Sequence, residues 1–285
     1  MNLAFEEVRL RLPHMEVAAH LYGPEDGRPV IALHGWLDNA ASFSRLAPML
    51  SGVRIVALDL PGHGLSDHRP PGVSYQLWDY ASEVLQTAEQ FGWKRFSLLG
   101  HSLGAIISVL IAGAVPERIE RLALIDGVIP YTGEAEVAPQ KLGEALRALL
   151  KVDHKRKPVY TRFEQAVEAR MKGVGAVSRE AAERLAQRGL MPVSGGYTWR
   201  TDPRLMLPSP MRLSRAHALA FAGQVGCPVS LVLAEQGLMS DRESIELIES
   251  LPFEVHRLAG GHHLHLDDDA GAAAIAAVFN PFLAG

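Results

Sequence analysis

The segment Phe96–Gly104 reads FSLLGHSLG, and the apolar run Ala105–Ala114 follows it. An apolar run of strand length, then Gly-His-Ser-Leu-Gly, then small and branched residues typical of a buried helix predict a sharp strand-to-helix turn at Ser102. Gly100 and Gly104 leave room where a side chain would collide with the neighbouring helix or strand. We therefore expect a nucleophile elbow, in which the serine has a strained backbone and the first N–H groups of the helix point at any negative charge formed beside it.

The composition is that of an ordinary globular protein. With 285 residues, 48% of them hydrophobic and 21% charged, the chain has enough apolar side chains for the core of one α/β domain with an inserted subdomain. The 28 Lys and Arg residues against 32 Asp and Glu give a net charge of -4, which does not favour binding to nucleic acid or to an anionic membrane. No run approaches the roughly 20 apolar residues of a membrane span, so none is predicted.

Two further features of the sequence indicate the cellular compartment in which the protein is expected. The segment Met1–Leu10 carries Glu6 and Glu7 and has no continuous apolar region, which argues against a secretory signal. The single cysteine, Cys227, cannot form a disulfide within the chain, and it precedes Pro228 and an apolar strand. We therefore expect a reduced, cytoplasmic location and a packing role for this thiol.

Short apolar segments alternate with helical ones along most of the chain. This alternation predicts a mostly parallel sheet with helices on both faces, and sites in such folds form at the carboxyl ends of the strands. An edge hairpin is expected first, and a helix is expected over residues 39–50. The predicted strands are Phe5–Leu12, Met15–Tyr22, Val30–Leu33, Arg54–Leu58, Phe96–Leu99, Leu122–Ile125, Val229–Ala234 and Glu254–Leu258, and the last helices are Asp241–Ser250 and Asp269–Phe282.

Residues 127–225 change from this alternation to helical spacing. Three segments there have apolar or small residues at helical intervals: Lys141–Lys151, Phe163–Lys172 and Arg179–Gln187. We therefore predict an α/β core of residues 1–126 and 226–285, with residues 127–225 inserted as a helical cap or lid.

Two short motifs lie in the predicted cap. Tyr197 and Trp199 lead out of it, and they either line a substrate channel or pack within the cap. The basic run Asp153–Lys157 is only five residues long in an acidic protein, so we interpret it as a solvated loop and expect no nucleic-acid partner.

Three motifs together resemble the α/β-hydrolase superfamily: His34–Trp36 reads HGW, Asp59–Ser66 reads DLPGHGLS, and Gly100–Gly104 reads GHSLG. The resemblance covers nearly the whole chain. GWLDN at residues 35–39 and AEQGL at residues 234–238 are similar to the serine hydrolase-like (kraken-type) esterases in particular. The resemblance implies an α/β-hydrolase fold with a catalytic serine, acid and histidine in that chain order.

The resemblance also implies where an oxyanion would be held. Acyl transfer needs positioned donors for this oxyanion, each worth about 3 to 4 kcal/mol. In the family these are backbone N–H groups, here those of Trp36 and Leu103, and the Trp36 indole would either wall the acyl pocket or pack in the core. His34, His63 and His101 lie in family loop motifs where imidazole braces loops by hydrogen bonding. Of these, His34 and His101 are also candidates to line the pocket.

The base is expected near the C-terminus, where His262, His263 and His265 lie close together. The family pattern is Gly-His followed five residues later by an acid that begins the last helix. His262 fits this pattern, with Asp267 as that acid; His263 is the alternative base, and His265 is assigned to packing. Three neighbouring histidines also suggest a metal site, but no Cys or Glu cluster accompanies them, so neither a metal nor an organic cofactor is predicted.

The residue that would serve as the catalytic acid does not lie where most members of the family carry it. After the strand Val229–Ala234, most relatives carry an aspartate where this chain has Gly237, which cannot orient an imidazole. Other relatives carry the acid after the preceding strand, where this chain has Asp126. We therefore choose Asp126, although a strand-end Asp also commonly caps a turn. Glu235 and Asp241 are the alternative acids.

The sequence therefore predicts a serine-dependent carboxylic ester hydrolase. Ser102 would form an acyl-enzyme with a small to medium hydrophobic acyl group of a small-molecule ester. A serine nucleophile argues against the epoxide-hydrolase and dehalogenase branches, whereas thioester, amide and carbon–carbon substrates use the same groups. The alternative from another class is a non-catalytic ligand-binding homologue whose triad is lost at Gly237. Oligomeric state cannot be predicted from the sequence.

Overall fold

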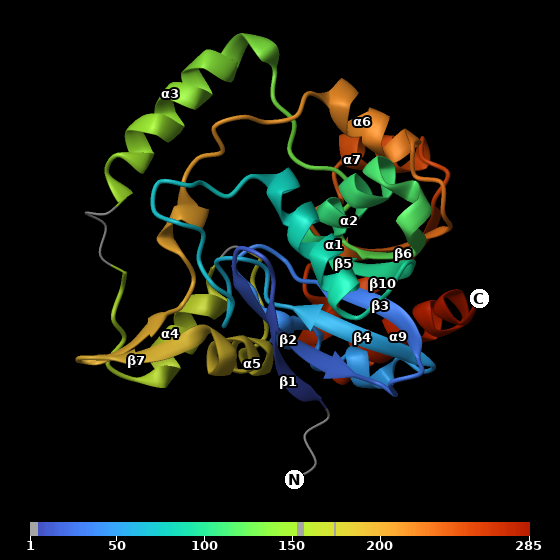
Figure 1. Cartoon of the computed structure of the whole chain (residues 1–285), viewed down its shortest axis with the longest axis horizontal. Coiled ribbons are helices and arrows are strands. Elements are labelled where there is room, and N and C mark those ends of the chain that lie inside the picture. The colour runs from blue at the N-terminus through green and yellow to red at the C-terminus, as the bar shows by residue number, and fades with distance from the viewer. Residues whose placement is uncertain (1–4, 153–156, 174) are drawn as a thin grey trace.

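The computed structural model of the chain describes residues 5–152, 157–173 and 175–285. Within these residues one sheet of eight strands has the order β1-β2-β4-β3-β5-β6-β9-β10 (Figure 1). β2 is antiparallel to both of its neighbours, and every other neighbouring pair is parallel. The strands are β1 (Glu6–Arg11), β2 (Glu16–Tyr22), β3 (Arg28–Leu33), β4 (Val53–Leu58), β5 (Phe96–His101), β6 (Ile119–Ile125), β9 (Val229–Gln236) and β10 (Glu254–Gly261).

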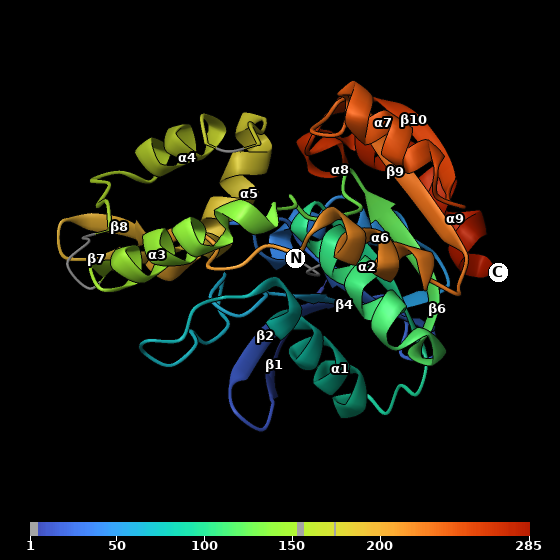
Figure 2. The same ribbon diagram turned by 90° about the horizontal axis from the view of Figure 1, so that it is seen from above.

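Helices cover both faces of this sheet, which confirms the predicted fold class (Figure 2). The α-helices are α1 (Tyr80–Gln90), α2 (Leu103–Ala114), α3 (Ala138–Leu149), α4 (Phe163–Met171), α5 (Arg179–Gly189), α6 (Arg215–Gly223), α7 (Arg242–Glu249), α8 (Leu264–Asp267) and α9 (Asp269–Ala284). The 3-10 helices are η1 (Ala40–Phe43), η2 (Ala47–Met49), η3 (Leu77–Asp79), η4 (Pro116–Arg118), η5 (Ala135–Val137) and η7 (Pro203–Met206). A bilayer crossing demands more length and apolar character than any helix of the described residues has.

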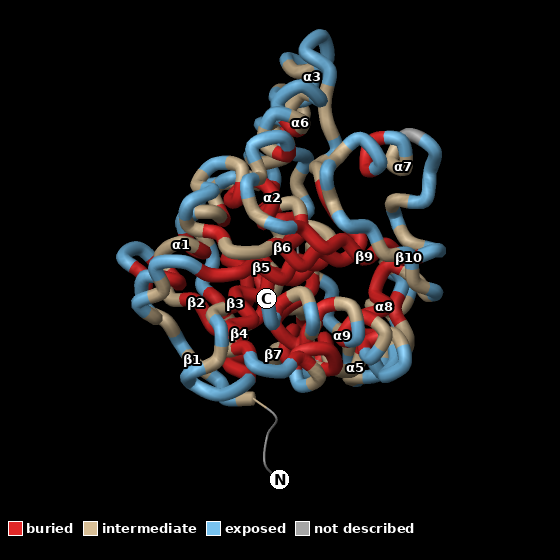
Figure 3. The backbone as a smooth tube through the Cα atoms, turned by 90° about the vertical axis from the view of Figure 1, so that its right-hand side faces the viewer, coloured by how far each residue is buried: buried red, intermediate tan, exposed pale blue. Residues whose placement is uncertain are grey.

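The hydrophobic core has two parts, one on each face of the sheet, because successive side chains of a strand point to opposite faces. Leu98 and Leu99 of β5 are both fully buried, but Leu98 packs with α1, α2 and α6, whereas Leu99 packs with η1 and α9 on the other face. Such a side chain contributes about 1.5 to 3 kcal/mol through the apolar surface it removes from water. Buried segments therefore run through the middle of the molecule with exposed segments outside (Figure 3).

One predicted helix is wrong. Residues 39–50 form the short 3-10 helices η1 and η2 instead of one α-helix. Asn39 caps η1 by accepting the N–H of Ala41 at 3.0 Å. Pro48 lies in the first turn of η2, and because proline has no N–H and its ring clashes with the preceding turn, it prevents a continuous helix.

The segment between β6 and β9 contains the three helices predicted there, observed as α3, α4 and α5, and a hairpin of β7 (Leu190–Val193) and β8 (Gly196–Trp199). α3 projects from the body of the molecule and is mostly exposed or half-buried (Figures 1 and 3). α6, the last helix of this segment, packs on α2 beside the sheet. The division at residues 127 and 225 stays a prediction, and residues 153–156 of the basic run lie outside the described residues.

Candidate active site

Ser102 occupies the sharp turn between β5 and α2. Its backbone has φ 51° and ψ -114°, in the left-handed half of dihedral space where a residue with a side chain is strained. A Cβ at Gly104 would lie 1.9 Å from the carbonyl oxygen of Leu33, and one at Gly100 would lie 2.5 Å from the backbone of Ala105. Because only glycine fits at both places, the strand and the helix approach closely enough to expose the serine at the turn.

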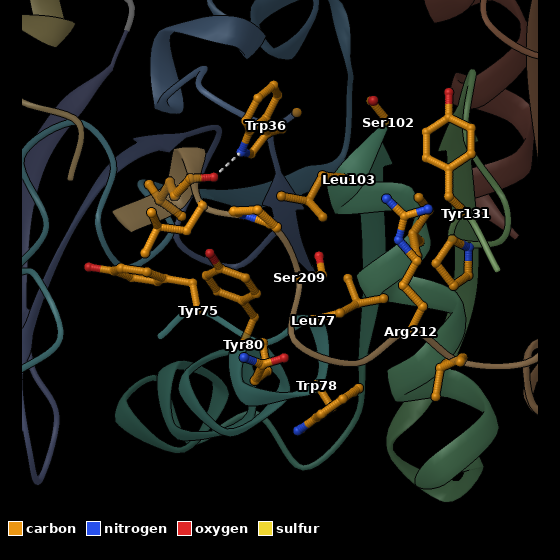
Figure 4. Close-up of a pocket in the computed structure, with 18 of the residues that line it drawn as sticks. Trp36, Tyr75, Leu77, Trp78, Tyr80, Ser102, Leu103, Tyr131, Ser209 and Arg212 are labelled. Atoms are coloured by element: carbon orange, nitrogen blue, oxygen red, sulfur yellow. Dashed lines mark hydrogen bonds between the residues drawn. The ribbon is translucent and has the colours of Figure 1, made fainter. Parts of the chain in front are cut away.

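Two backbone N–H groups that the sequence predicts as oxyanion donors belong to residues lining the same cavity as Ser102. Those of Trp36 and Leu103 have no acceptor within the described part of the chain. A tight turn, in which the N–H of Asp38 donates to the carbonyl of Gly35 at 3.1 Å, holds the loop that carries Trp36. The indole of Trp36 donates to the carbonyl of Leu205 at 3.1 Å and walls the cavity (Figure 4).

His262 and Asp126 form a buried pair. The His262 Nδ1–H donates to Asp126 Oδ2 at 2.6 Å, and these residues are only 8% and 2% exposed. The Asp126 carboxylate also accepts the backbone N–H groups of Ala234 at 3.2 Å and Leu238 at 3.0 Å. Three hydrogen bonds thus hold the carboxylate, and the carboxylate sets the tautomer and orientation of the imidazole, whose Nε2 is left as the basic atom.

Gly237 leaves room for the carboxylate of Asp126, which follows β6. A Cβ at Gly237 would lie 2.3 Å from Asp126 Oδ1 and 2.6 Å from its Cγ, so the Asp126 carboxylate occupies the space that a side chain at residue 237 would take. The alternative acids lie elsewhere. Glu235 is exposed, and Asp241 caps α7 by accepting the N–H of Ser244 at 3.0 Å.

Ser102 and His262 line one cavity of about 510 Å³. Apolar and aromatic side chains make most of its wall, among them Trp36, Tyr75, Leu77, Trp78, Tyr80 and Tyr131 (Figure 4). Within the described residues no direct hydrogen bond joins the Ser102 hydroxyl to His262. In the free state of hydrolases this bond is commonly longer than in the substrate complex. No family motif predicts the walls from the loop before α1 or from residues 207–213, because these segments reach the cavity only through the tertiary fold.

His34 does not line the cavity, which corrects one prediction. It is fully buried, donates from Nδ1 to the carbonyl of Gly35 at 2.7 Å and accepts the N–H of Leu60 at Nε2 at 3.0 Å. Burial lowers the pKa of His34 to about 4, so the ring is neutral. Its hydrogen bonds join the loops after β3 and β4, the bracing role that the family motif implies.

Tyr197 and Trp199 do not line the cavity either. Both belong to β8 and pack against a cluster made by α4 and α5. A Cβ at Gly189 of α5 would lie 2.8 Å from the Trp199 ring, so this helix and the indole are in close contact. These aromatic side chains therefore stabilise the segment between β6 and β9, the alternative that the sequence left open.

His101 lines the cavity and supports the loop that carries His262. Its Nε2–H donates to the backbone carbonyl of His262 at 2.9 Å, and the ring centroids of His262, His263 and His265 lie 4.2 to 4.8 Å from its own. Burial, together with these neighbouring imidazoles, holds the pKa of His101 well below its usual range. His101 is therefore neutral. His265 is buried, with its Nε2 2.8 Å from Ser42 Oγ, which agrees with a packing role.

His263, the alternative base, pairs with a different acid. Its Nε2–H donates to Asp38 Oδ2 at 3.1 Å, and Arg170 of α4 donates to Asp38 Oδ1 at 2.7 Å. Burial alone would raise the pKa of Asp38, but His263 and Arg170 hold it well below its usual range. The carboxylate is therefore charged, and it joins α4 to the loop of Trp36.

Asp38, His101 and His263 place one ligand atom each within 4.8 Å of the others, a spacing compatible with a metal ion. The donors are already engaged, since Asp38 binds His263 and the guanidinium of Arg170. A cation between these groups would meet the fixed positive charge of Arg170, so the residues do not suit a resident metal.

Asp267 does not begin the last helix, which corrects a further expectation. It accepts the N–H of Ser178 at 2.7 Å, at the N-terminus of α5. Asp268 caps α9 instead, by accepting the N–H of Gly271 at 2.7 Å. The acid five residues after His262 therefore fastens α5 to the histidine loop.

Comparisons with known proteins agree with this geometry. Residues 28–269 match the family model of the alpha/beta hydrolase fold. The chain is 31% identical to a serine hydrolase-like protein of Danio rerio over 99% of this chain and 90% of that one. It is also 31% identical to serine hydrolase-like protein 2 of Homo sapiens over 96% of this chain and 93% of that one.

Solved structures include a hypothetical protein from Pseudomonas aeruginosa PAO1, with a TM-score of 0.97 and 72% identity over 98% of this chain and 100% of that one. A thioesterase domain from the curacin biosynthetic pathway has a TM-score of 0.84 and 26% identity over 96% of this chain and 99% of that one. The chain belongs to the α/β-hydrolase fold family, in which it is a serine hydrolase-like protein.

Proposed function

We propose that the protein hydrolyses carboxylic esters through an acyl-enzyme on Ser102. The observation that carries this proposal is the buried hydrogen bond from His262 to Asp126, with His262 and Ser102 on the wall of one cavity. His262 Nε2 accepts the hydroxyl proton as Ser102 Oγ bonds to the acyl carbon. The proton then passes to the departing alcohol, and a water molecule activated by the same imidazole releases the acid.

The negative charge formed on the acyl oxygen would be held by the backbone N–H groups of Trp36 and Leu103. Both are free of other acceptors within the described residues, and Leu103 is the first residue of α2. The positive end of the helix dipole adds to this stabilisation. Such donors act because the charge is larger in the transition state than in the bound substrate.

The cavity supports a small to medium hydrophobic acyl group. Its volume of about 510 Å³ lies within the range of small-molecule sites, and its wall is mostly apolar. A thioester is the second candidate substrate, because the chain is similar to a thioesterase domain over 96% of its length. The alternative is a non-catalytic homologue whose triad is lost at Gly237, and the hydrogen bond between Asp126 and His262 supports the catalytic protein over it.

Labelling with a fluorophosphonate probe tests the proposal, together with hydrolysis of p-nitrophenyl butyrate. The wild-type protein should be labelled and active, and Ser102→Ala should lose both properties. Ser209→Ala is the matched control, because Ser209 carries a hydroxyl in the same cavity and should keep both (Figure 4). Absence of labelling and turnover in folded wild type, or labelling that persists in Ser102→Ala, contradicts the proposal.

A further inference from the structure

Among the described residues, the wall of the cavity beside Ser102 has three charged side chains, and two of them are paired with groups of opposite charge in the protein. Asp38 binds Arg170 and His263. Arg204 binds the carboxylate of Asp202 at 2.7 Å and also donates to backbone carbonyls of the loop before α1. The third is Arg212.

Arg212 has neither an ion pair nor a side-chain hydrogen bond within residues 5–152, 157–173 and 175–285. It is exposed and lines the cavity, and in the view of Figure 4 its guanidinium is directed toward the side on which Ser102 and Leu103 lie. Among the described residues of the cavity wall, Arg212 therefore carries the one positive charge that no carboxylate pairs with.

The backbone that carries Arg212 is held in place. The N–H of Gly133 donates to the carbonyl of Leu213 at 3.0 Å, which joins this segment to the chain that follows β6. A Cβ at Gly133 would lie 3.0 Å from Arg212 Cβ, so the arginine stem packs directly over the glycine. This packing restricts the stem and leaves the guanidinium to point into the cavity, which lowers the entropy lost when it binds a ligand.

We propose that Arg212 binds an anionic group of the substrate, so that the protein prefers esters or thioesters with a carboxylate or a phosphate some distance from the scissile carbonyl. This inference rests on the proposed function. A guanidinium binds either oxyanion through two parallel hydrogen bonds, which fix the orientation of the anion as well as attract it. The net charge of -4 repels anions from the protein as a whole, so an anionic substrate needs such a local partner.

Two pairs of substrates test this inference and distinguish the source of the anion. In the first pair, mono-p-nitrophenyl glutarate has a carboxylate at the end of the acyl chain that p-nitrophenyl butyrate lacks. In the second pair, butyryl phosphopantetheine has a phosphate on the leaving group that butyryl pantetheine lacks. For each pair the measured quantity is the ratio of kcat/KM for the anionic member to kcat/KM for the neutral member.

Arg212→Gln should lower this ratio about 10- to 100-fold for one of the two pairs, mainly through KM, because a hydrogen-bonded charge pair is lost. Arg212→Lys should give an intermediate ratio, since a point charge keeps the attraction without the two-pronged geometry. Arg215→Gln is the matched control, because this exposed arginine does not line the cavity, and its ratio should equal that of wild type. A ratio unchanged by Arg212→Gln in both pairs overturns the inference.

Binding to the Ser102→Ala variant gives a test that does not depend on turnover. Calorimetry should show that glutaramate or phosphopantetheine binds more tightly than butyramide or pantetheine, and that adding Arg212→Gln removes the difference. If wild type neither reacts with a fluorophosphonate nor hydrolyses any of the four substrates, the proposed function fails. The binding comparison still decides the role of Arg212, because equal affinities for charged and neutral ligands would refute it.

Discussion

Asp126 and Gly237 act as a matched pair of residues at the end of neighbouring strands. The carboxylate that holds His262 comes from residue 126, and the absence of a side chain at residue 237 provides the space it needs. The commonest family form places the acid at the second position instead. The two arrangements exclude each other, because both carboxylates would occupy the same volume beside one imidazole.

Because the two arrangements exclude each other, Gly237→Asp should lower activity in the wild-type chain and raise it in the Asp126→Gly variant. Gly237→Asp in the wild-type chain should destabilise the fold by about 1 to 3 kcal/mol and lower activity, because it overfills the site and sets two like charges together. Asp126→Gly alone should lower kcat about 10 000-fold, since His262 loses its orienting carboxylate. Asp126→Gly combined with Gly237→Asp should recover a measurable part of that loss.

The measurement is kcat for p-nitrophenyl butyrate, with thermal unfolding of each variant to show that it is folded. Glu235→Gln serves as the control, because that carboxylate is exposed on β9 and should not affect kcat. A double variant no more active than Asp126→Gly would show that residue 237 cannot present an acid to His262.

At the scale of elements, buried ion pairs join α4 and α5 to the loops of the sheet. Arg170 of α4 pairs with Asp38, two residues after Trp36. Arg188 of α5 pairs with Asp59 after β4, with its Nε 2.9 Å from the carboxylate. All four side chains are at least nine-tenths buried, so each pair is sensitive to the loss of one partner.

We expect Arg170→Met and Arg188→Met to differ in catalysis but not in stability. Each leaves a buried aspartate without its cation and should cost about 3 to 5 kcal/mol of unfolding free energy. Only Arg170→Met should also lower kcat, by about 10- to 100-fold with little change in KM. Its partner Asp38 positions the turn that carries Trp36, and this carboxylate loses its cation in the variant. Urea unfolding and steady-state kinetics of both variants provide the comparison.

Equal losses of kcat in the two variants would mean that general loosening of the inserted segment, and not the turn of Trp36, limits activity. Arg170→Lys should restore part of the rate, since a lysine keeps a positive charge near Asp38 while losing the planar guanidinium.

These examples show which elements the sequence could predict. Strands and the elbow at Ser102 depend on local patterns of apolar residues and glycine, and those patterns survive in the fold. Residues 39–50 are predicted wrongly because Pro48 limits helix length more than the apolar spacing indicates. Arg170 and Arg212 carry no signal of their own, because their roles depend on contacts between segments far apart in the chain.

At the scale of the whole molecule, several histidines are buried in the neutral form. Burial lowers the pKa of His20 and His34 to about 4 and that of His63 to about 3. In the unfolded chain the pKa of each returns to about 6.5. Between pH 6.5 and pH 4 the unfolded state therefore binds more protons than the folded state, so stability falls as the pH falls through this window.

We expect the free energy of unfolding to be nearly constant above pH 7 and to fall near pH 5 by about 4 kcal/mol per pH unit from His20, His34 and His63, which corresponds to about three protons taken up on unfolding. Burial also holds the pKa of His101 and His265 well below its usual range, so these two histidines make the fall steeper. Asp38 adds to the loss only below about pH 4, because its pKa is lowered in the folded protein. Urea unfolding between pH 8 and pH 4.5 measures the slope. A slope below about 1.4 kcal/mol per pH unit, equivalent to one proton, would contradict these protonation states.

The position of Asp126 directly after β6 also determines how the chain could be divided. Ser102, Asp126 and the loop of Trp36 all precede α3, whereas His262 follows α7. If the proposed function holds, two polypeptides separated between α3 and α4 should each be inert, with Ser102 and Asp126 on one and His262 on the other. Ester cleavage by the mixture would then report their reassembly, since the bond between Asp126 and His262 would have to form across the break.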